Sequence, residues 1–138
     1  MKKNQRAQNF SWNHLEKQQQ ELLRLAVKAR SNAQAPYSHY AVGAAVLSQN
    51  GGMYSGCNVE RCSYTQTTHA EQNAVDTMIA HEGSVKIEAI AVVGAPQSEQ
   101  ISLTSVSREY NVKKNQGSAA IACKSFGKTV FLIRMCQL

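Results

Sequence analysis

The chain has 138 residues, of which 43% are hydrophobic and 17% are charged, a size and balance that suit one globular domain. No apolar run approaches the roughly 18 residues that a membrane-spanning helix requires, so we expect no membrane-embedded part. Polar residues follow the basic Met1–Arg6 segment, so no secretory signal is expected, and the four cysteines are expected to be reduced thiols of a cytoplasmic protein.

The formal net charge of +6 is concentrated near the end of the chain. Residues 1–104 carry nine Lys or Arg against eight Asp or Glu, whereas residues 105–138 carry six against one. A basic segment can bind nucleic acid, but this one contains no nucleic-acid-binding motif, so we expect no such partner. The change at residues 104/105 is a compositional boundary.

The first expected element is an amphipathic helix over residues 15–30, after a mobile polar lead-in at residues 1–13. The apolar residues that recur on one face at helical spacing are Leu22, Leu25, Ala26 and Ala29. The helix should end before Pro36, because proline pushes the residue that precedes it into an extended conformation.

A β-hairpin is expected next. Residues 40–47 are small and apolar, which is typical of a buried strand, and the return strand is expected over residues 53–59. Asn50-Gly51-Gly52 between them is a strong hairpin turn, because these residues tolerate positive φ angles.

A second amphipathic helix is expected to begin at Thr68 and to end at Gly83-Ser84, with Ala70, Ala74, Val75, Met78 and Ile79 on its apolar face. Thr68 is a favourable N-cap, which would place His69 and Glu71 in the electropositive first turn. His-x-Glu is the first half of the signature of zinc-dependent deaminases, but the second half, Pro-Cys-x-x-Cys, is missing from this chain. The alternative interpretation is a capping box, in which Thr68 and Glu71 only satisfy backbone amides.

The segment at residues 86–93 predicts a central strand, which we expect to lie parallel to its neighbour because it follows a crossover helix. The order α-β-β-α-β indicates an α/β fold, a mixed sheet with helices packed on it. Beyond Pro96 the pattern weakens, and the apolar runs at residues 119–123 and 129–133 are either strands or collapsed segments. No repeat or domain boundary is found, so residues 1–138 are treated as a single domain.

Three motifs resemble the cytidine deaminase family, in that family's order. Ala35–Ala45 resembles its first-strand motif, Gly56–Tyr64 its ribose-binding segment, and Thr68–Val75 its first zinc motif with histidine in place of cysteine. The resemblance extends over residues 12–104 and implies a three-layer cytidine-deaminase-like fold, whereas residues 105–138 form a divergent basic tail.

The resemblance implies a reaction, the hydrolytic deamination of cytidine or deoxycytidine to uridine or deoxyuridine by zinc-activated water. His69 would be a zinc ligand, and Glu71 would move protons between the water, the ring and the departing ammonia.

The remaining implied roles concern substrate and assembly. Asn58 and Glu60 would hold ribose hydroxyls, Tyr40 would pack near the base, and the Ala70 backbone would bind the base. The implied partner is a small-molecule pyrimidine nucleoside, used in pyrimidine salvage, and the implied assembly is a homodimer or homotetramer.

The match fails where the family carries its two zinc-binding cysteines, because residues 101–110 contain neither cysteine nor proline. Catalytic zinc requires three protein ligands, and only Cys123 and Cys136 lie downstream as thiols. Two hypotheses stay open. The C-terminal part is truncated or aberrant, through a frameshift or a retained intron, or the protein is a catalytically inactive relative that keeps nucleoside binding or oligomerisation.

Overall fold

The computed structural model describes residues 12–103, 113–115, 118–125 and 128–135. Its elements are η1 (Trp12–His14), α1 (Lys17–Arg30), β1 (Tyr40–Ser48), β2 (Met53–Cys57), η2 (Tyr64–Gln66), α2 (Ala70–Glu82), β3 (Ile87–Pro96), β4 (Lys113–Asn115), β5 (Ser118–Ser125) and β6 (Lys128–Met135). Residues 1–11 of the expected lead-in, the segment at residues 104–112 and Cys136 lie outside the described residues.

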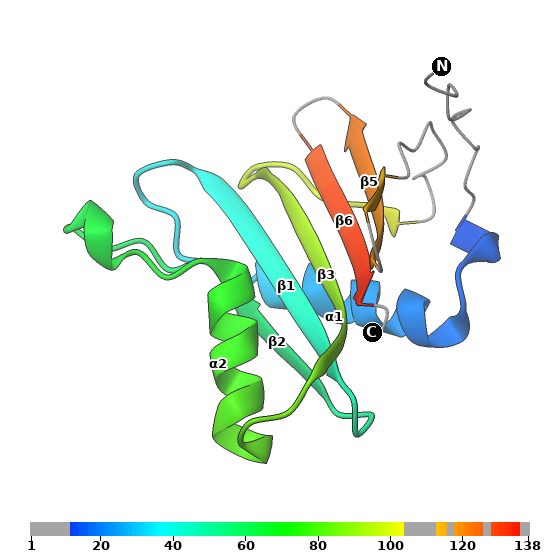
Figure 1. Ribbon diagram of the computed structural model, residues 1–138. Coiled ribbons are helices and arrows are strands. Elements are labelled where there is room, and N and C mark those ends of the chain that lie inside the picture. The colour runs from blue at the N-terminus through cyan, green and yellow to red at the C-terminus, as the bar shows by residue number, and fades with distance from the viewer. Residues whose placement is uncertain (1–11, 104–112, 116–117, 126–127, 136–138) are drawn as a thin grey trace.

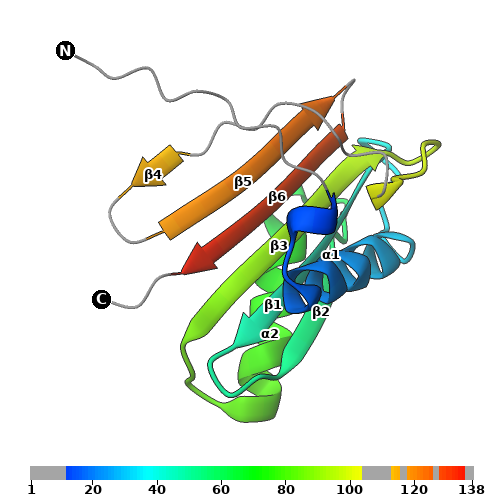
Figure 2. The ribbon, with the colours of Figure 1, turned by 90° about the vertical axis from the view of Figure 1, so that its right-hand side faces the viewer.

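One six-stranded sheet carries the fold, with the strand order β2-β1-β3-β6-β5-β4 (Figure 2). Helix α2 packs on β1 and β2 from one face, and α1 packs on the opposite face (Figure 1). The expected α/β fold with helices on a sheet is therefore confirmed, in three layers.

The two faces of the sheet have separate apolar cores, because side chains alternate along β1. Ala45 and Leu47 contribute to the core under α1, together with Leu22 and Ala26 of that helix. Ala44 and Val46 contribute to the core under α2, with Ala74 and Met78. The apolar run of β1 that predicted a buried strand is thus explained by burial on both faces.

The crossover through α2 brings β3 back in the same direction as β2, but β1 lies between the two strands. Strand β3 pairs antiparallel with β1, from Tyr40↔Pro96 to Ser48↔Ile87, and antiparallel with β6 on its other side. The prediction of a parallel neighbour was wrong, because the crossover fixes only the relative direction of the strands it joins. The apolar β1 and β3 instead take adjacent central positions, where both faces are covered.

Helix α1 approaches β1 very closely at Gly43. A Cβ atom at this position would lie 2.0 Å from the carbonyl oxygen of Ala26. The Arg30 guanidinium near the end of α1 donates hydrogen bonds to the carbonyls of Ala41, Ala95 and Pro96, at 2.8–3.0 Å. This helix is therefore fixed to the start of β1 and the end of β3.

The described part of the expected lead-in belongs to the fold. Trp12 is half-buried and packs against the core under α1. Its carbonyl accepts a hydrogen bond from Gln20 at 2.9 Å, and the Arg24 guanidinium lies 5.1 Å from its ring centroid. None of the helices in the described ranges reaches the length and apolar content needed to cross a bilayer.

The two apolar runs near the end of the chain are strands. β6 pairs with β3 over six residues, from Ala89↔Arg134 to Gly94↔Thr129, and β5 pairs with β6 along its whole length. Of the two interpretations left open by the sequence, the backbone supports strands.

Candidate functional site

The loop after β2 brings the three sequence motifs together. Val59, which lies between Asn58 and Glu60, pairs with Thr68 through two backbone hydrogen bonds of 2.9 and 3.0 Å. On its other side, Gln34 donates to the carbonyl of Asn58 and accepts from the amide of Glu60, at 3.0 and 2.8 Å. The segment that carries Asn58 and Glu60 is therefore held between the turn before β1 and the entry of α2.

The N-cap of α2 is His69 and not Thr68, so the predicted helix start was wrong by one residue. Thr68 stays extended because its N–H and carbonyl are both used by Val59, and its Oγ1 accepts a hydrogen bond from Arg61 at 2.7 Å. The capping box between Thr68 and Glu71, which was the alternative interpretation of this motif, is consequently not formed.

His69 and Glu71 are both exposed at the entry of α2. The His69 side chain makes no capping hydrogen bond, and the helix begins with the bond from the Asn73 amide to the His69 carbonyl, at 2.9 Å. The amides of residues 70–72 therefore have no intrahelical acceptor, which makes this end electropositive. An imidazole, a carboxylate and three amide donors are presented at one helix end.

Asn58 is 9% exposed, and both ends of its side-chain amide contact β1. Its Oδ1 accepts from the Val42 amide, and its Nδ2 donates to the Tyr40 carbonyl, each at 2.9 Å. One N–H of the amide and one lone pair of Oδ1 remain for a ligand. The role of Asn58 in binding ribose stays a prediction.

The Glu60 carboxylate is enclosed by the turn before β1. Its Oε2 accepts from the amides of Tyr37 and Ser38, at 3.0 and 3.1 Å, and its Oε1 accepts from the Ser38 hydroxyl. The hydrogen bond from the Ser38 hydroxyl is the main cause that lowers the pKa of Glu60, and the two amides lower it further. Glu60 is therefore ionised at neutral pH.

Tyr40 lies half-buried at the first position of β1. Its ring covers Gly94 of β3, since a Cβ atom on that glycine would be 2.9 Å from Cε1 of the ring. Through its backbone, Tyr40 contacts both Asn58 and Ser38. The backbone of Tyr40 therefore lies next to Asn58 and Ser38, whereas the packing of its ring near a base stays a prediction.

The described residues do not fit a three-ligand zinc site. Across the described ranges, no three His, Cys, Asp or Glu side chains gather closely enough to hold a metal ion. Cys57 points to the α1 face, because Tyr54 and Gly56 of the same strand face α2. Cys62 is exposed in the following loop. His69 therefore stands as a single candidate ligand.

Cys123 lies far across the sheet from the entry of α2. Its backbone is in register with Val130 of β6, which is in register with Val93 of β3, itself opposite Gly43 of β1. Three strand spacings separate β5 from β1, about 14 Å in all, whereas a zinc–sulfur bond is about 2.3 Å. Cys123 on β5 is therefore too far from the entry of α2 to share a metal ion with His69.

Two residues of the site were not assigned a role from the sequence. Ser38 bonds to Glu60, and Arg61 donates to the Gln66 carbonyl at 2.8 Å as well as to Thr68. The Ser38–Glu60 contact joins residues 22 positions apart. No local pattern reports such a contact, and in the sequence Ser38 was only part of a longer motif.

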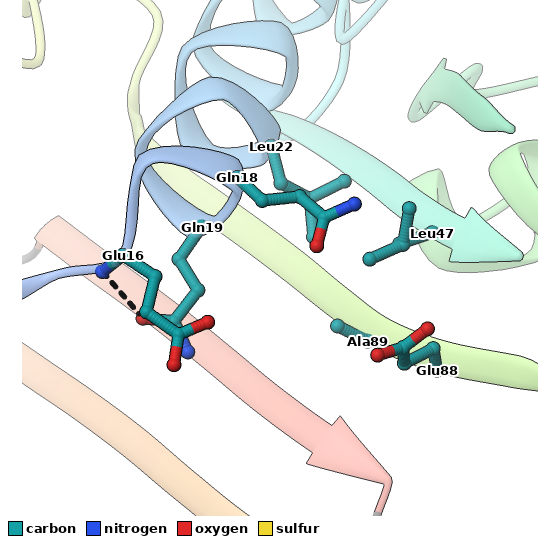
Figure 3. Close-up of a pocket in the computed structure, with 7 residues that line it drawn as sticks. All are labelled: Glu16, Gln18, Gln19, Leu22, Leu47, Glu88 and Ala89. Atoms are coloured by element: carbon teal, nitrogen blue, oxygen red, sulfur yellow. Dashed lines mark hydrogen bonds between the residues drawn. The ribbon is translucent and has the colours of Figure 1, made fainter. Parts of the chain in front are cut away.

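A pocket at the opposite end of β1 is separate from this site. Figure 3 shows its lining, in which Leu22, Leu47 and Ala89 are surrounded by the polar Glu16, Gln18, Gln19 and Glu88. The capping bond from the Glu16 amide to Gln19 Oε1, at 3.1 Å, lies at its edge. None of the expected site residues lines it.

Comparison with known proteins shows which family and which relatives the chain is similar to. Residues 16–98 match the cytidine and deoxycytidylate deaminase zinc-binding region. The chain is 39% identical over 74 residues to a cytidine deaminase of Sporosarcina psychrophila, covering 54% of each protein, so it spans about half the length of that relative. It is 31% identical over 116 residues to a probable cytidine deaminase of Dictyostelium discoideum, covering 81% of this chain and 77% of that protein.

Solved structures of cytidine deaminases are also similar to this chain. The crystal structure of cytidine deaminase from Mycobacterium tuberculosis aligns with a TM-score of 0.52 and 36% identity, over 62% of this chain and 63% of that one. The cytidine deaminase structure from Burkholderia pseudomallei aligns with a TM-score of 0.54 and 27% identity, over 80% and 88%.

Proposed function

Because the chain belongs to the cytidine and deoxycytidylate deaminase family, we propose that it binds a pyrimidine nucleoside and deaminates it. The reaction adds one water to cytidine or deoxycytidine and releases ammonia together with uridine or deoxyuridine. The substrate is a free nucleoside.

The observation that carries this proposal is the pairing of Val59 with Thr68. It holds the segment with Asn58 and Glu60 directly beside the segment that leads into His69 and Glu71. Backbone hydrogen bonds therefore hold the residues proposed to bind the sugar beside the residues proposed to transfer protons.

Each residue is proposed to act through a group that the structure leaves available. Glu60 and Asn58 bind sugar hydroxyls, and the Tyr40 ring packs near the base. Glu71 transfers protons during the loss of the amino group, because its carboxylate is exposed and is not used in capping. The Ala70 amide, which has no intrahelical acceptor, binds the base.

Zinc is the metal of the family region that this chain matches. Since the described residues supply His69 without two further ligands, the steps proposed for this chain are nucleoside binding, orientation and proton transfer. The family membership further leads us to propose a cytoplasmic homodimer or homotetramer that acts in pyrimidine salvage, and light scattering of the purified chain tests its oligomeric state.

The test combines turnover, binding and metal content. Purified full-length protein is incubated with cytidine, uridine and ammonia are quantified, cytidine affinity is measured by calorimetry, and zinc is measured by elemental analysis. We expect turnover that falls at least about 100-fold in Glu71→Gln, because general acid–base catalysis contributes that much. Cytidine affinity should be retained in this variant. Glu21→Gln, on an exposed position of α1, is the matched control.

Two results would contradict the proposal. Cytidine binding without turnover in the wild-type chain would support the inactive, nucleoside-binding alternative. Neither binding nor turnover would exclude both interpretations.

A further inference from the structure

The turn that precedes β1 is built around the Glu60 carboxylate. His39 closes the turn with its amide bonded to the Ala35 carbonyl at 3.0 Å, and its φ angle of 57° lies in the left-handed region. The His39 carbonyl also accepts from the Gln97 amide at 2.7 Å, which ties the turn to the end of β3. The donors that surround Glu60 are therefore held by backbone contacts at both ends of the turn.

The Ser38 hydroxyl has a fixed direction. Its oxygen accepts a hydrogen bond from the Tyr40 amide at 3.1 Å, and its proton is donated to Oε1 of Glu60. The hydroxyl thus connects the first residue of β1 with the carboxylate. The position of the Ser38 hydroxyl therefore depends on Tyr40, and the position of the Glu60 carboxylate depends on the Ser38 hydroxyl.

A carboxylate offers about four acceptor positions, two on each oxygen. In Glu60, the amides of Tyr37 and Ser38 use both positions on Oε2, and the Ser38 hydroxyl uses one position on Oε1. One acceptor position on Oε1 remains. A ligand hydroxyl that bonds to Glu60 has this position available without breaking a bond within the protein.

We propose that Ser38 is a positioning residue of the nucleoside site, whose hydroxyl holds the Glu60 carboxylate so that the remaining acceptor on Oε1 takes one sugar hydroxyl. The Tyr40 amide bonds to the oxygen of the same hydroxyl and so helps to direct its proton toward Glu60. This inference rests on the function proposed above, and it assigns Ser38 an effect on sugar recognition alone.

The experiment separates sugar recognition from base recognition. Dissociation constants of the full-length chain are measured by calorimetry for cytidine and for cytosine, which lacks the sugar. Ser38→Ala should weaken cytidine binding about 5- to 10-fold, the effect of one hydrogen bond, and leave cytosine binding unchanged. Ser38→Thr keeps a hydroxyl and should retain cytidine affinity.

Ser31→Ala is the matched control, because the Ser31 hydroxyl is exposed and bonds to the Lys28 carbonyl and not to a residue of the site. A second readout is the NMR titration of the Glu60 carboxyl carbon. The pKa of the Glu60 carboxyl should rise toward its ordinary value in Ser38→Ala and stay low in Ser31→Ala. The ionisable side chains of His39 and Tyr37 lie close to this carboxylate, and Cys62 lies beside Tyr37, so the NMR signal is compared between variants over the same pH range.

Unchanged cytidine affinity in Ser38→Ala, with wild-type binding intact, would overturn this inference and leave the proposed function standing. Equal losses for cytidine and cytosine would also overturn it, because they would indicate a general structural role. A wild-type chain that fails to bind cytidine would overturn the proposed function and this inference together.

Discussion

Asn58 donates a hydrogen bond from its Nδ2 to the backbone carbonyl of Tyr40, over 2.9 Å. Its Oδ1 accepts from the Val42 amide, so one side chain satisfies two backbone groups of β1 beyond the end of β2. The side-chain amide therefore continues the β1–β2 ladder for one more step. A residue expected to bind a sugar also holds the strand that carries Tyr40.

Replacing Asn58 should consequently affect stability as well as binding. Asn58→Leu leaves the Val42 N–H and the Tyr40 carbonyl without these partners, and we expect the free energy of unfolding to fall by roughly 1–3 kcal/mol. Urea unfolding followed by circular dichroism measures the change. Ser63→Ala in the exposed loop is the control, and equal unfolding midpoints for Asn58→Leu and the wild type would contradict the structural role.

Glu82, at the end of α2, should make stability depend on pH. The Ser48 hydroxyl is the main cause that lowers its pKa; burial opposes this effect, and Asn50 and Tyr54 lower the pKa further. A carboxyl with a lowered pKa in the folded state stabilises the fold above its unfolded pKa of about 4.3, and this stabilisation is lost as the pH falls through the folded pKa.

We therefore expect Glu82→Gln to reduce the difference in unfolding free energy between pH 6 and pH 3. Urea denaturation at the two pH values measures this difference for the wild type and the variant. Glu21→Gln, in an exposed position of α1, is compared under the same conditions. If Glu82→Gln and the wild type lost the same free energy between the two pH values, Glu82 would have no part in the acid sensitivity.

The close approach of α1 to β1 predicts a large effect at Gly43. In Gly43→Ala the added methyl meets the Ala26 carbonyl and the Arg30 backbone, neither of which can turn away, so we expect a loss of at least about 1–3 kcal/mol. Gly94→Ala is the matched control, because the added methyl meets the ring of Tyr40, a side chain that can rotate. In thermal and urea unfolding, Gly43→Ala should have a lower midpoint than Gly94→Ala. The reverse order would contradict the close packing of α1 on β1.

The sequence predicted the elements whose signals are local. The Asn50-Gly51-Gly52 turn placed the hairpin, and Gly83 ended α2 as expected, with a positive φ of 74°. The neighbour of β3 could not be predicted in this way. It depends on which strands bury both faces, a property of the assembled sheet.

The sequence named the candidate site residues one by one, but it did not predict the hydrogen bonds that connect them. Thr68 has the chemistry of an N-cap, yet pairing with Val59, nine residues earlier, moves the cap to His69. The contact of Ser38 with Glu60 is likewise decided by the folding of two loops against each other. In both cases a partner distant in the sequence overrides a local preference, and only the structure shows that partner.

The last prediction concerns the C-terminal strands. If residues 105–138 were unrelated to the fold, their deletion would change stability little. The structure places β6 against β3 over Ala89–Gly94, in the centre of the sheet. Without β6, the apolar β3 would become an exposed edge, which loses its ladder bonds and invites pairing with other chains. We therefore expect a chain ending at Thr104 to unfold at lower urea concentration and to associate in light scattering.

A point substitution tests the same pairing within the full chain. Leu132→Pro should lower the unfolding midpoint in the same direction as the truncation, because Leu132 lies opposite Ala91 and proline cannot donate to a strand ladder. Lys128→Pro is the matched control, since proline is tolerated at the first residue of a strand. Should truncation and Leu132→Pro both unfold at the wild-type midpoint, β6 would contribute no stability, and residues 12–103 would carry the fold alone.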